Sequence, residues 1–349
     1  MKTIEAGVLG GTGMVGQHFI RFLRGHPWFK LTWLGASDRS AGKKLKDAAP
    51  WRLDGEMPAD AAEITVSESK PGHAPRLVFS AMDASVATEI EREFANAGHV
   101  VVSNSRNHRM EPDVPLIVPE VNPGHLSLLA AQQRNRQWSG MIVTNPNCST
   151  IVLSMALAPL KPFGIERVLA ATMQAVSGAG YPGVPSMDVV GNVIPFIGSE
   201  EEKMQQETQK ILGEIDDGKA SPLKARVSAH CHRVAVVDGH MVAASVELSN
   251  RANLDEIRNA IENFCGVPQK RGLPSAPEKP IVYMPQPDRP QPRRDAEREN
   301  GMAVFVGRLR ECPVLDVKFV ACGHNTIRGA AGAAVLNAEL MVSEGLLEE

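Results

Sequence analysis

The sequence predicts an α/β protein of two domains, a doubly wound parallel sheet followed by an α+β domain on a mixed sheet. Length is the first observation, because 349 residues suffice for about two domains that each bury a core. The second is a regular alternation of short apolar runs with helical patterns over residues 1–147. Beyond that range the apolar residues recur in longer alternating runs, which are typical of a mixed or antiparallel sheet with one covered face.

The elements of the first domain follow from the spacing of its apolar residues. Short apolar runs bounded by glycine or polar residues predict strands at residues 3–10, 31–36, 77–80, 100–102 and 141–143. Apolar residues at helical spacing predict helices at residues 14–23 and 84–97. Strands that alternate with helices indicate a mostly parallel, doubly wound sheet.

The second domain begins with a predicted helix at residues 150–157. Alternating apolar residues then predict strands at residues 168–174, 226–236, 240–248, 303–308 and 315–321. An alanine-rich helix at residues 326–343 follows the last strand. Seven prolines between Pro274 and Pro292 predict an extended segment without regular structure, either a surface loop or an arm at a subunit interface.

Composition excludes several classes of protein. The chain has 37 Lys and Arg against 40 Asp and Glu, a net charge of -3 and only 5% aromatic residues. A nucleic-acid-binding protein would show a basic surplus and aromatic residues for stacking, so no nucleic acid is expected as a partner. The N-terminal residues show no apolar stretch typical of an export signal.

Two further features argue for a cytoplasmic protein without a membrane partner. The longest uncharged stretch, residues 137–160, contains the polar turn Asn145-Pro146-Asn147 and so fits a strand, a turn and a helix better than a membrane span. The five cysteines are odd in number and form no CxxC pair, which indicates reduced thiols rather than disulfides or a zinc site.

A glycine-rich loop joins the first predicted strand to the first predicted helix. In this loop Gly10 allows a tight turn, Gly13 lets the backbone approach a pyrophosphate, and Gly16 lets the helix pack on the strand. Thr12, Met14 and Val15 lie in the same loop. The position near the chain start predicts a Rossmann-type domain that binds a dinucleotide, against the alternative of a merely structural turn.

The end of the second predicted strand bears on the choice between NAD and NADP. Asp38 lies 22 positions after Gly16, near the spacing of an acid that binds a ribose 2'-hydroxyl. Ser37, Arg39 and Ser40 instead offer donors and positive charge for a 2'-phosphate. We favour NADP(H), with Asp38 turned outward.

Cys148 is the candidate nucleophile. It follows Asn147 at the junction of an apolar strand and an apolar helix, where a helix N-terminus can stabilise a thiolate. The N–H groups of Ser149 and Thr150 lie in the first helical turn and could bind an oxyanion. The alternative is a buried structural cysteine.

Three histidines lie close together in the sequence. His230 and His232 share one face of the predicted strand and Arg233 lies on the other, so a metal site is not expected. His240 follows the turn residues Asp238 and Gly239, which puts it at a strand end where it can act as an acid–base catalyst. The alternative is a structural histidine.

Ten short segments, taken in order, resemble the aspartate-semialdehyde dehydrogenases, particularly their archaeal and fungal branch. The segments are GVLGGTGMVGQ, ASDRSAGKK, VFSAMDA, SNSRNHRM, VPEVN, TNPNCST, MQAVSGAGYPG, GNVIPFIGSEEEKM, HRVAVVDGH and NTIRGAAGAAVLNAE. The resemblance implies a phosphorylating, NADP-dependent aldehyde dehydrogenase. Such enzymes reduce L-aspartyl-4-phosphate to L-aspartate-4-semialdehyde through a cysteine thioester, on the route to Lys, Thr, Met and Ile.

The resemblance also implies a domain division and an oligomer. Residues 1–147 would form the NADP-binding domain, completed by residues 325–349, and residues 148–324 the catalytic and dimerisation domain. A homodimer or homotetramer is expected.

Roles for individual residues follow from the same resemblance. Cys148 would be the nucleophile, His240 the acid–base catalyst, and Gln174 would orient the substrate carbonyl. Arg233 would bind the substrate α-carboxylate and Glu201 its ammonium, while Lys203 and Arg109 would hold the phosphate, with Arg106 as a competitor of Arg109. Asn147 would also line the substrate site. The expected cofactor contacts outside the glycine loop and the 37–40 turn are Ser80, Ser177, Ala179 and Asn325.

Some alternatives stay open on the sequence. Ser199 and Glu202 match a helix capping box, so Glu201 and Lys203 could belong to a solvated helix start. The same fold and thioester would serve a malonyl-CoA or succinyl-CoA reductase, which lacks an α-ammonium in its substrate. N-acetylglutamyl-phosphate reductase is a more distant alternative, since its nucleophile motif differs. A non-catalytic NADP-binding protein would not need Cys148 and His240 together.

Overall fold

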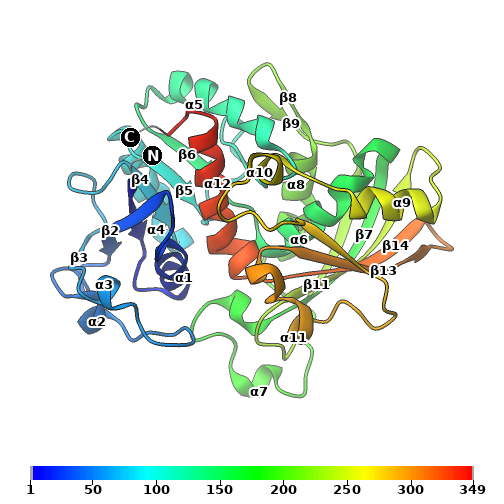
Figure 1. Cartoon of the computed structure of the whole chain (residues 1–349), viewed down its shortest axis with the longest axis horizontal. Coiled ribbons are helices and arrows are strands. Elements are labelled where there is room, and N and C mark those ends of the chain that lie inside the picture. The colour runs from blue at the N-terminus through cyan, green and yellow to red at the C-terminus, as the bar shows by residue number, and fades with distance from the viewer. Residues whose placement is uncertain (1–2, 348–349) are drawn as a thin grey trace.

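The computed structural model describes residues 3–347, which contain two six-stranded sheets, one in each half of the chain. Helix α12 (Gly332–Ser343) lies between the two halves (Figure 1). The expected α/β architecture, a doubly wound domain followed by a domain on a mixed sheet, is confirmed.

The first sheet is parallel throughout, as predicted. Its strand order is β3-β2-β1-β4-β5-β6, so the order reverses between β1 and β4. Ligands of doubly wound sheets bind outside the carboxyl ends of the strands at such a reversal. The strands are β1 (Ile4–Leu9), β2 (Phe29–Ala36), β3 (Val66–Glu68), β4 (Leu77–Ser80), β5 (Val100–Ser103) and β6 (Met141–Thr144).

Helices cover the first sheet, and two of them agree with the predicted spans. Helix α1 (Met14–Leu23) has the predicted bounds, and α4 (Ala84–Asn96) ends one residue before the predicted end. Strand β3 and helix α5 were not predicted, because β3 has only three residues and α5 presents a single apolar turn before a polar one. The remaining helices of this half are α2 (Leu45–Ala48), α3 (Ala59–Ala62), η1 (Pro123–Ser127) and α5 (Leu128–Arg136).

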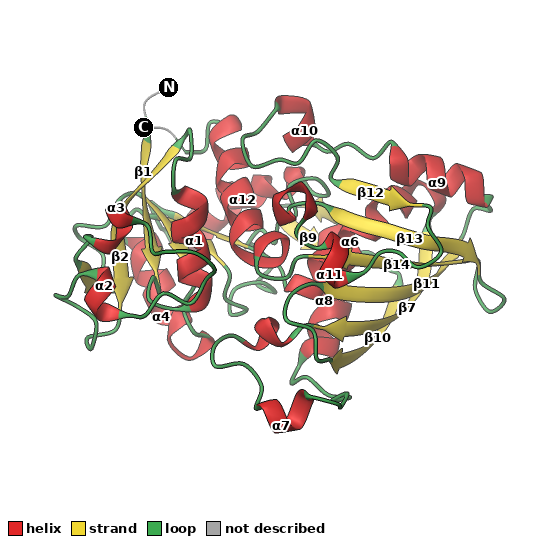
Figure 2. Cartoon of the chain, turned by 60° about the horizontal axis from the view of Figure 1, so that its bottom comes forward, coloured by secondary structure: helices red, strands yellow, loops and turns green. Residues whose placement is uncertain are grey.

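The second sheet is mixed, with the order β10-β7-β11-β14-β13-β12 (Figure 2). The β10–β7 and β12–β13 pairs are parallel, and the other three pairs are antiparallel. Its strands are β7 (Ile165–Gln174), β10 (Arg226–Arg233), β11 (His240–Leu248), β12 (Ile281–Met284), β13 (Val304–Glu311) and β14 (Val317–Gly323). A separate hairpin consists of β8 (Glu214–Asp216) and β9 (Lys219–Ser221).

The prediction that the proline-rich segment lacks regular structure is wrong. Strand β12 lies inside it, between Pro280 and Pro285, and forms the edge of the second sheet. Proline is tolerated next to an edge strand because only one side of that strand needs backbone donors. A short helix, α11 (Pro292–Asp295), ends the segment.

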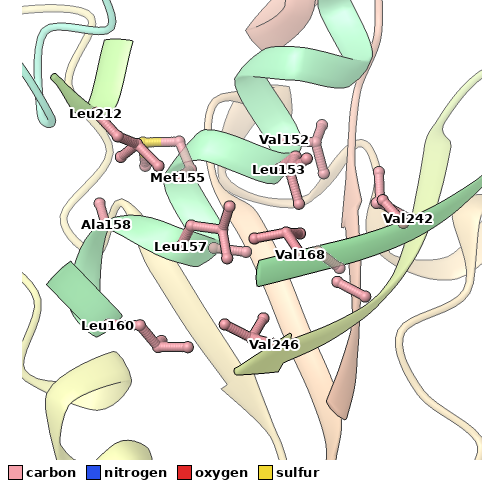
Figure 3. Close-up of a cluster of buried hydrophobic side chains, with 14 of the residues drawn as sticks. Val152, Leu153, Met155, Leu157, Ala158, Leu160, Val168, Leu212, Val242 and Val246 are labelled. Carbon is pink, nitrogen blue, oxygen red and sulfur yellow. The ribbon is translucent and has the colours of Figure 1, made fainter. Parts of the chain in front are cut away.

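Helices pack on one face of the second sheet and leave the other face without cover from residues 3–347. Apolar side chains of α6 (Cys148–Leu157), such as Val152 and Leu153, meet Val168 and Val242 of the sheet (Figure 3). Helix α8 was predicted only at its first turn. The other helices of this half are η2 (Ala158–Phe163), η3 (Val176–Ala179), α7 (Ser186–Val189), α8 (Glu200–Leu212), α9 (Leu254–Glu262), α10 (Val267–Arg271) and η4 (Arg298–Gly301).

The C-terminal segment returns to the first sheet. The predicted helix at residues 326–343 consists of a π-helical turn, η5 (Ile327–Ala331), followed by α12. Val335 and Leu340 of α12 belong to the same buried cluster as Val8 of β1. Arg328 of η5 is fully buried and binds both carboxylate oxygens of Glu120, which fastens the segment to the first half of the chain.

Residues 137–160 form strand β6, a turn and helix α6, as predicted. No helix within residues 3–347 has the length and apolar character required to cross a membrane.

Candidate active site

The N-terminus of helix α1 is shaped to receive an anion. Gly10 has a φ of +75°, and a β-carbon there would lie 2.7 Å from the carbonyl oxygen of Ala81, so this position requires glycine. A β-carbon at Gly16 would overlap the carbonyl oxygen of Gly10. Within residues 3–347 no side chain caps this helix at Gly13, and its first turn carries no acidic residue. The free N–H groups of the first turn therefore fit a dinucleotide pyrophosphate.

The other predicted cofactor residues lie in four places, of which the first three belong to the first half of the chain. Thr12, Met14 and Val15 are partly exposed in the glycine loop, and Ser37, Arg39 and Ser40 lie with Asp38 in the solvent-accessible turn after β2. Ser80, in contrast, is fully buried: its hydroxyl donates to Glu91 at 2.6 Å and its carbonyl accepts from the Asn104 N–H. Both groups of Ser80 are thus engaged inside the fold, and the cofactor contact at Ser80 stays a prediction.

Asn325 joins two loops at the ends of inner strands of the second sheet. Its amide Nδ2 donates to the Ser177 hydroxyl at 2.8 Å, and its Oδ1 accepts from the Gly239 N–H at 2.8 Å. Ala179 is exposed at the end of η3. These contacts bring the C-terminal segment beside the turn that precedes His240.

Cys148 is the first residue of helix α6, and Asn147 is its N-cap. The side-chain oxygen of Asn147 accepts from the N–H groups of Ser149 and Thr150, at 3.0 and 3.1 Å. The prediction that these two N–H groups bind an oxyanion is therefore wrong, because the cap already satisfies them.

The Ser149 N–H at the helix N-terminus acts to lower the pKa of the Cys148 thiol, as expected, but it does not decide that pKa. Burial of the sulfur, followed by the negative charge of Glu200, raises this pKa to about 12. Arg109, Arg233 and the Ser149 N–H act in the opposite direction and are outweighed. The residue as a whole is partly exposed, although its sulfur is buried.

His240 is the first residue of β11 and is fully buried. Its Nδ1 accepts from the Ala175 N–H at 3.1 Å; because a backbone N–H can only donate, the neutral ring must carry its proton on Nε2. Nε2 has no hydrogen-bond partner within residues 3–347. Burial first, and then the charges of Arg233 and His324, lower the pKa of His240 to about 3, so the ring is neutral at physiological pH.

Gln174 and Arg233 are register partners at the ends of β7 and β10. The Arg233 guanidinium is held by a 2.7 Å hydrogen bond from Nη1 to the carbonyl of Ala175, and burial lowers the pKa of this group. Gly178 lies directly against this group: a β-carbon there would be 2.8 Å from Arg233 Nη1 and 3.0 Å from His240 Nε2. Arg233 and His240 therefore converge on one backbone position.

Helix α8 directs Glu200, and not Glu201, toward the nucleophile. Glu200 is buried, and its Oε2 accepts from Asn147 Nδ2 at 2.8 Å and from Gln174 Nε2 at 3.4 Å. Lys203 donates to the other oxygen of Glu200 at 2.7 Å. The Glu201 carboxylate turns to the Cys231 N–H instead, at 3.1 Å. Residues 200–202 are all glutamate, so the sequence alone could not tell which of them faces Cys148, and these contacts favour Glu200 over the predicted Glu201.

The predicted capping box of this helix does not form. Ser199 has a φ of +55°, and its side chain makes no cap hydrogen bond within the described residues. Its hydroxyl accepts from Arg106 instead, at 3.2 Å. Arg106 is exposed, whereas Arg109 is buried and donates to the Asn104 carbonyl at 2.7 Å and to Glu207 at 2.9 Å. The preference for Arg109 over Arg106 as a residue of the buried site is thus supported by its position.

Cys231 and His324 border this site, since Cys231 lies beside Gln174 and His324 acts on the pKa of His240. His230 and His232 occupy one face of β10 and Arg233 the other, as predicted. In the part of the chain that the structure describes, no three His, Cys, Asp or Glu side chains are arranged to hold a metal ion. All five cysteines lie within that part and are unpaired.

Two glycines of the site were missed by sequence reasoning. Gly178 lies beside His240, and Gly329 lies behind the nucleophile, where a β-carbon would be 2.6 Å from that of Cys148. Each of these glycines lies against side chains from a distant part of the sequence, so no local sequence pattern could identify it. Glu200 and Glu207 carried a usable signal, since residues 200, 203, 207 and 210 share one face of a helix.

Removing the charge of Glu200 is expected to activate the Cys148 thiol. In Glu200→Gln the pKa of Cys148 should fall, and alkylation by iodoacetamide at pH 8 should become faster because the thiolate reacts. The rate at Cys148 should be read by mass spectrometry of its peptide, because Cys265 is exposed and also reacts. The matched control is Glu202→Gln, an exposed glutamate of the same helix. A slower or unchanged rate in Glu200→Gln would contradict the electrostatic role.

A Rossmann-type sheet with an open helix N-terminus, followed by a buried cysteine flanked by His240, Arg233 and Arg109, defines a nucleotide-dependent dehydrogenase with a cysteine nucleophile. Two family models match the chain: "Semialdehyde dehydrogenase, NAD binding domain" over residues 5–129 and "Semialdehyde dehydrogenase, dimerisation domain" over residues 157–328.

Individual relatives extend over almost the whole chain. The aspartate-semialdehyde dehydrogenase of Methanothermobacter thermautotrophicus is 53% identical over 97% of this chain and 99% of its own length. That of Saccharomyces cerevisiae is 46% identical over 98% of both chains. The crystal structure of the Candida albicans enzyme with NADP superimposes with a TM-score of 0.92 at 42% identity, covering 99% of this chain and 100% of that one. The chain belongs to the aspartate-semialdehyde dehydrogenase family.

Proposed function

We propose that the protein catalyses the NADPH-dependent reductive dephosphorylation of L-aspartyl-4-phosphate to L-aspartate-4-semialdehyde. The observation that carries this proposal is the set of charges around Cys148. Two buried arginines, Arg233 and Arg109, and one buried carboxylate, Glu200, influence the same thiol. These charges complement a substrate that carries a carboxylate, a phosphate and an ammonium group.

Arg233 binds the α-carboxylate in this proposal, and Glu200 replaces Glu201 as the partner of the α-ammonium. Lys203 and Arg109 hold the phosphate, and Gln174 orients the substrate carbonyl. Because Glu200 raises the pKa of Cys148, an ammonium group bound to Glu200 offsets that charge and favours the thiolate. Substrate binding then activates the nucleophile that attacks it.

The reaction begins when Cys148 Sγ attacks the carbonyl carbon of the acyl phosphate. A carbon–sulfur bond forms, the carbon–oxygen bond to phosphate breaks, and phosphate leaves with both electrons of that bond. The resulting thioester is a good acceptor for reduction, and bound NADPH supplies the hydride that makes the aldehyde oxidation state. Collapse of the Cys148 hemithioacetal then releases the semialdehyde and restores the thiol.

His240 provides the donor for the developing oxyanion. Its Nε2 proton lies on the ring edge beside Gly178, and the Ser149 and Thr150 N–H groups are occupied by the Asn147 cap. A fixed donor in a water-poor site stabilises an oxyanion more strongly than one in solvent. The Nε2 proton stays on the ring throughout, and the thiolate expelled when the hemithioacetal oxyanion collapses regains from solvent the proton that Cys148 lost before its attack.

The test of this function is phosphate-dependent formation of NADPH from L-aspartate-4-semialdehyde and NADP+, followed by absorbance. Rapid NADPH formation that requires phosphate is the expected result. Parallel reactions contain NAD+ in place of NADP+, no phosphate, or coenzyme A in place of phosphate. Signal only with coenzyme A would replace this proposal by an acyl-CoA reductase activity. Equal rates with NAD+ would contradict the assignment of Ser37, Arg39 and Ser40 to a 2'-phosphate.

We also propose that the catalytic half forms a homodimer or homotetramer through the uncovered face of the second sheet. This face is apolar at its centre, where Leu169, Ala171 and Met173 of β7 lie beside Met241 and Ala243 of β11. Leu169 is 50% exposed, which is unusual for a leucine of a central strand. A second copy of the chain would remove this surface from water.

A charge in the middle of this face is expected to disrupt the oligomer. Ala243→Asp should shift the mass measured by light scattering toward that of one chain, because a carboxylate would be buried without a partner. The control is Gln206→Asp, which adds the same charge to an exposed position of α8 on the opposite face. A wild-type protein of monomer mass would contradict the proposed oligomer.

The chain is proposed to divide into two domains and to work in a reducing compartment. We take residues 1–147 and 325–349 as the NADP-binding domain and residues 148–324 as the catalytic and dimerisation domain. Five unpaired cysteines within residues 3–347 support a reducing compartment such as the cytoplasm.

A further inference from the structure

Glu207 is a buried carboxylate that touches two separate parts of the active site. It lies in helix α8 and is only 2% exposed. One oxygen accepts from Arg109 Nη1 at 2.9 Å, and the other accepts from the backbone N–H of Asn147 at 2.7 Å. Arg109 follows strand β5, and Asn147 caps the helix that begins with Cys148. A single side chain thus joins the proposed phosphate-binding arginine to the start of the nucleophile helix.

The arrangement requires a carboxylate rather than an amide. Both partners of Glu207 are donors, and an ionised carboxylate presents two acceptor oxygens. A glutamine would accept from one partner and turn an N–H₂ group against the other. The ion pair is also enclosed, since Arg109 is 7% exposed, so loss of the negative charge leaves a buried cation.

The hydrogen bonds of Arg109 leave part of its guanidinium free for substrate. Nη1 is held by Glu207 and Nη2 by the Asn104 carbonyl at 2.7 Å, which fixes the plane of the group. Nε is buried and has no partner among residues 3–347. A guanidinium fixed at two nitrogens loses little freedom when an anion binds, which favours tight and oriented binding.

Lys210, one turn further along α8, secures the same loop by a different contact. Its Nζ donates to the carbonyls of Arg109, Glu111 and Val114 at 2.6, 2.7 and 2.8 Å. These bonds hold the backbone of residues 109–114 against α8 without touching the Arg109 guanidinium. The loop therefore keeps its place when Glu207 is changed, and the direct effect of Glu207 falls on the side chain of Arg109 and on Asn147.

We propose that Glu207 is a positioning residue that sets the Arg109 guanidinium and the N-terminus of the Cys148 helix relative to each other. Its two contacts fix the distance between the phosphate-binding group and the nucleophile, so that the leaving phosphate is held while sulfur attacks the adjacent carbon. This inference rests on the proposed role of Arg109 in phosphate binding. It adds that this role depends on Glu207 of α8, which holds the Arg109 guanidinium in place.

The test measures the KM for phosphate in the direction of semialdehyde oxidation, in the wild-type protein and in the variant Glu207→Gln. The KM for phosphate should rise about tenfold or more, as expected for loss of a hydrogen bond to a charged group, and kcat should fall. The KM for NADP+ should not change, because the two hydrogen bonds of Glu207 go to Arg109 and Asn147 and not to the glycine loop. Glu202→Gln, an exposed position on the same helix, is the matched control with wild-type constants expected.

A double-mutant cycle separates positioning from a general structural effect. If Glu207 acts through Arg109, Glu207→Gln in an Arg109→Leu background should add little to the phosphate KM of Arg109→Leu alone. Full additivity of the two effects, or an unchanged phosphate KM in Glu207→Gln while Arg109→Leu raises it, would overturn the inference. An unchanged phosphate KM in Arg109→Leu would instead remove the proposed role of Arg109. Should Glu207→Gln fail to fold, Glu207→Asp, which keeps the charge on a shorter side chain, gives the same two readouts.

Discussion

Replacing Cys148 by alanine is expected to lower turnover by about 10⁴-fold or more, because the thioester cannot form without the sulfur. NADP(H) affinity should remain near that of the wild type. The open N-terminus of α1 contributes the pyrophosphate site, and it lies in the first half of the chain. Steady-state NADPH formation and NADPH fluorescence titration measure the two quantities separately.

Cys265→Ala is the control for this experiment. Cys265 is exposed and lies in the loop between α9 and α10, away from the nucleophile helix. Its removal should leave kcat unchanged. Comparable turnover in Cys148→Ala and the wild type would refute the cysteine mechanism, and loss of NADPH binding in Cys148→Ala would indicate a wider structural defect.

Gly178→Ala is expected to reduce kcat/KM by about 10²-fold or more, the loss that a misplacement of about 1 Å can cause. The new methyl group would lie 2.8 Å from Arg233 Nη1 and 2.9 Å from His240 Cε1, closer than van der Waals contact allows. Either Arg233, proposed to bind the substrate carboxylate, or His240 must move. Because the backbone at Gly178 does not have a positive φ, the substitution carries no conformational strain of its own.

The kinetic constants should show which of the two side chains is displaced. Movement of Arg233 alone raises the KM for semialdehyde, whereas movement of His240 lowers kcat. Gly124→Ala is the control, since a β-carbon there meets nothing within 4 Å among the described residues. The melting temperature should be unchanged in both variants. Wild-type kinetics in Gly178→Ala would show that the crowded position has no bearing on catalysis.

Elements that depend on local spacing were predicted well. Helix α1 has the predicted bounds because apolar residues at helical spacing are preceded by glycines that cannot extend the helix backward, and strand β11 begins at His240 as predicted because a turn precedes it. The wrong prediction at β12 has a different origin. A run of prolines opposes regular structure locally, but the edge of a sheet accepts a short strand between them.

The residues of the site also divide into those that local motifs predicted and those that only packing could identify. Cys148, His240, Gln174, Arg233 and Arg109 all lie in or beside one buried region, and the ordered motifs pointed to each of them. The motifs did not resolve Glu200 from Glu201, because three consecutive glutamates differ only in the direction that each takes from the helix. Adjacent helical residues point about 100° apart, and only packing against the sheet selects which one faces the thiol.

The sequence by itself determined the class of fold, the glycine loop at the start of α1 and the candidate nucleophile, since each of these is encoded in local patterns along the chain. The tertiary structure alone decided the charge state of that nucleophile and its neighbours. The high pKa of Cys148, the neutral ring of His240 and the capped N–H groups of Ser149 and Thr150 come from burial and from partners contributed by distant segments. Electrostatic energies inside a protein depend on distances and solvent access that exist only after the chain has folded.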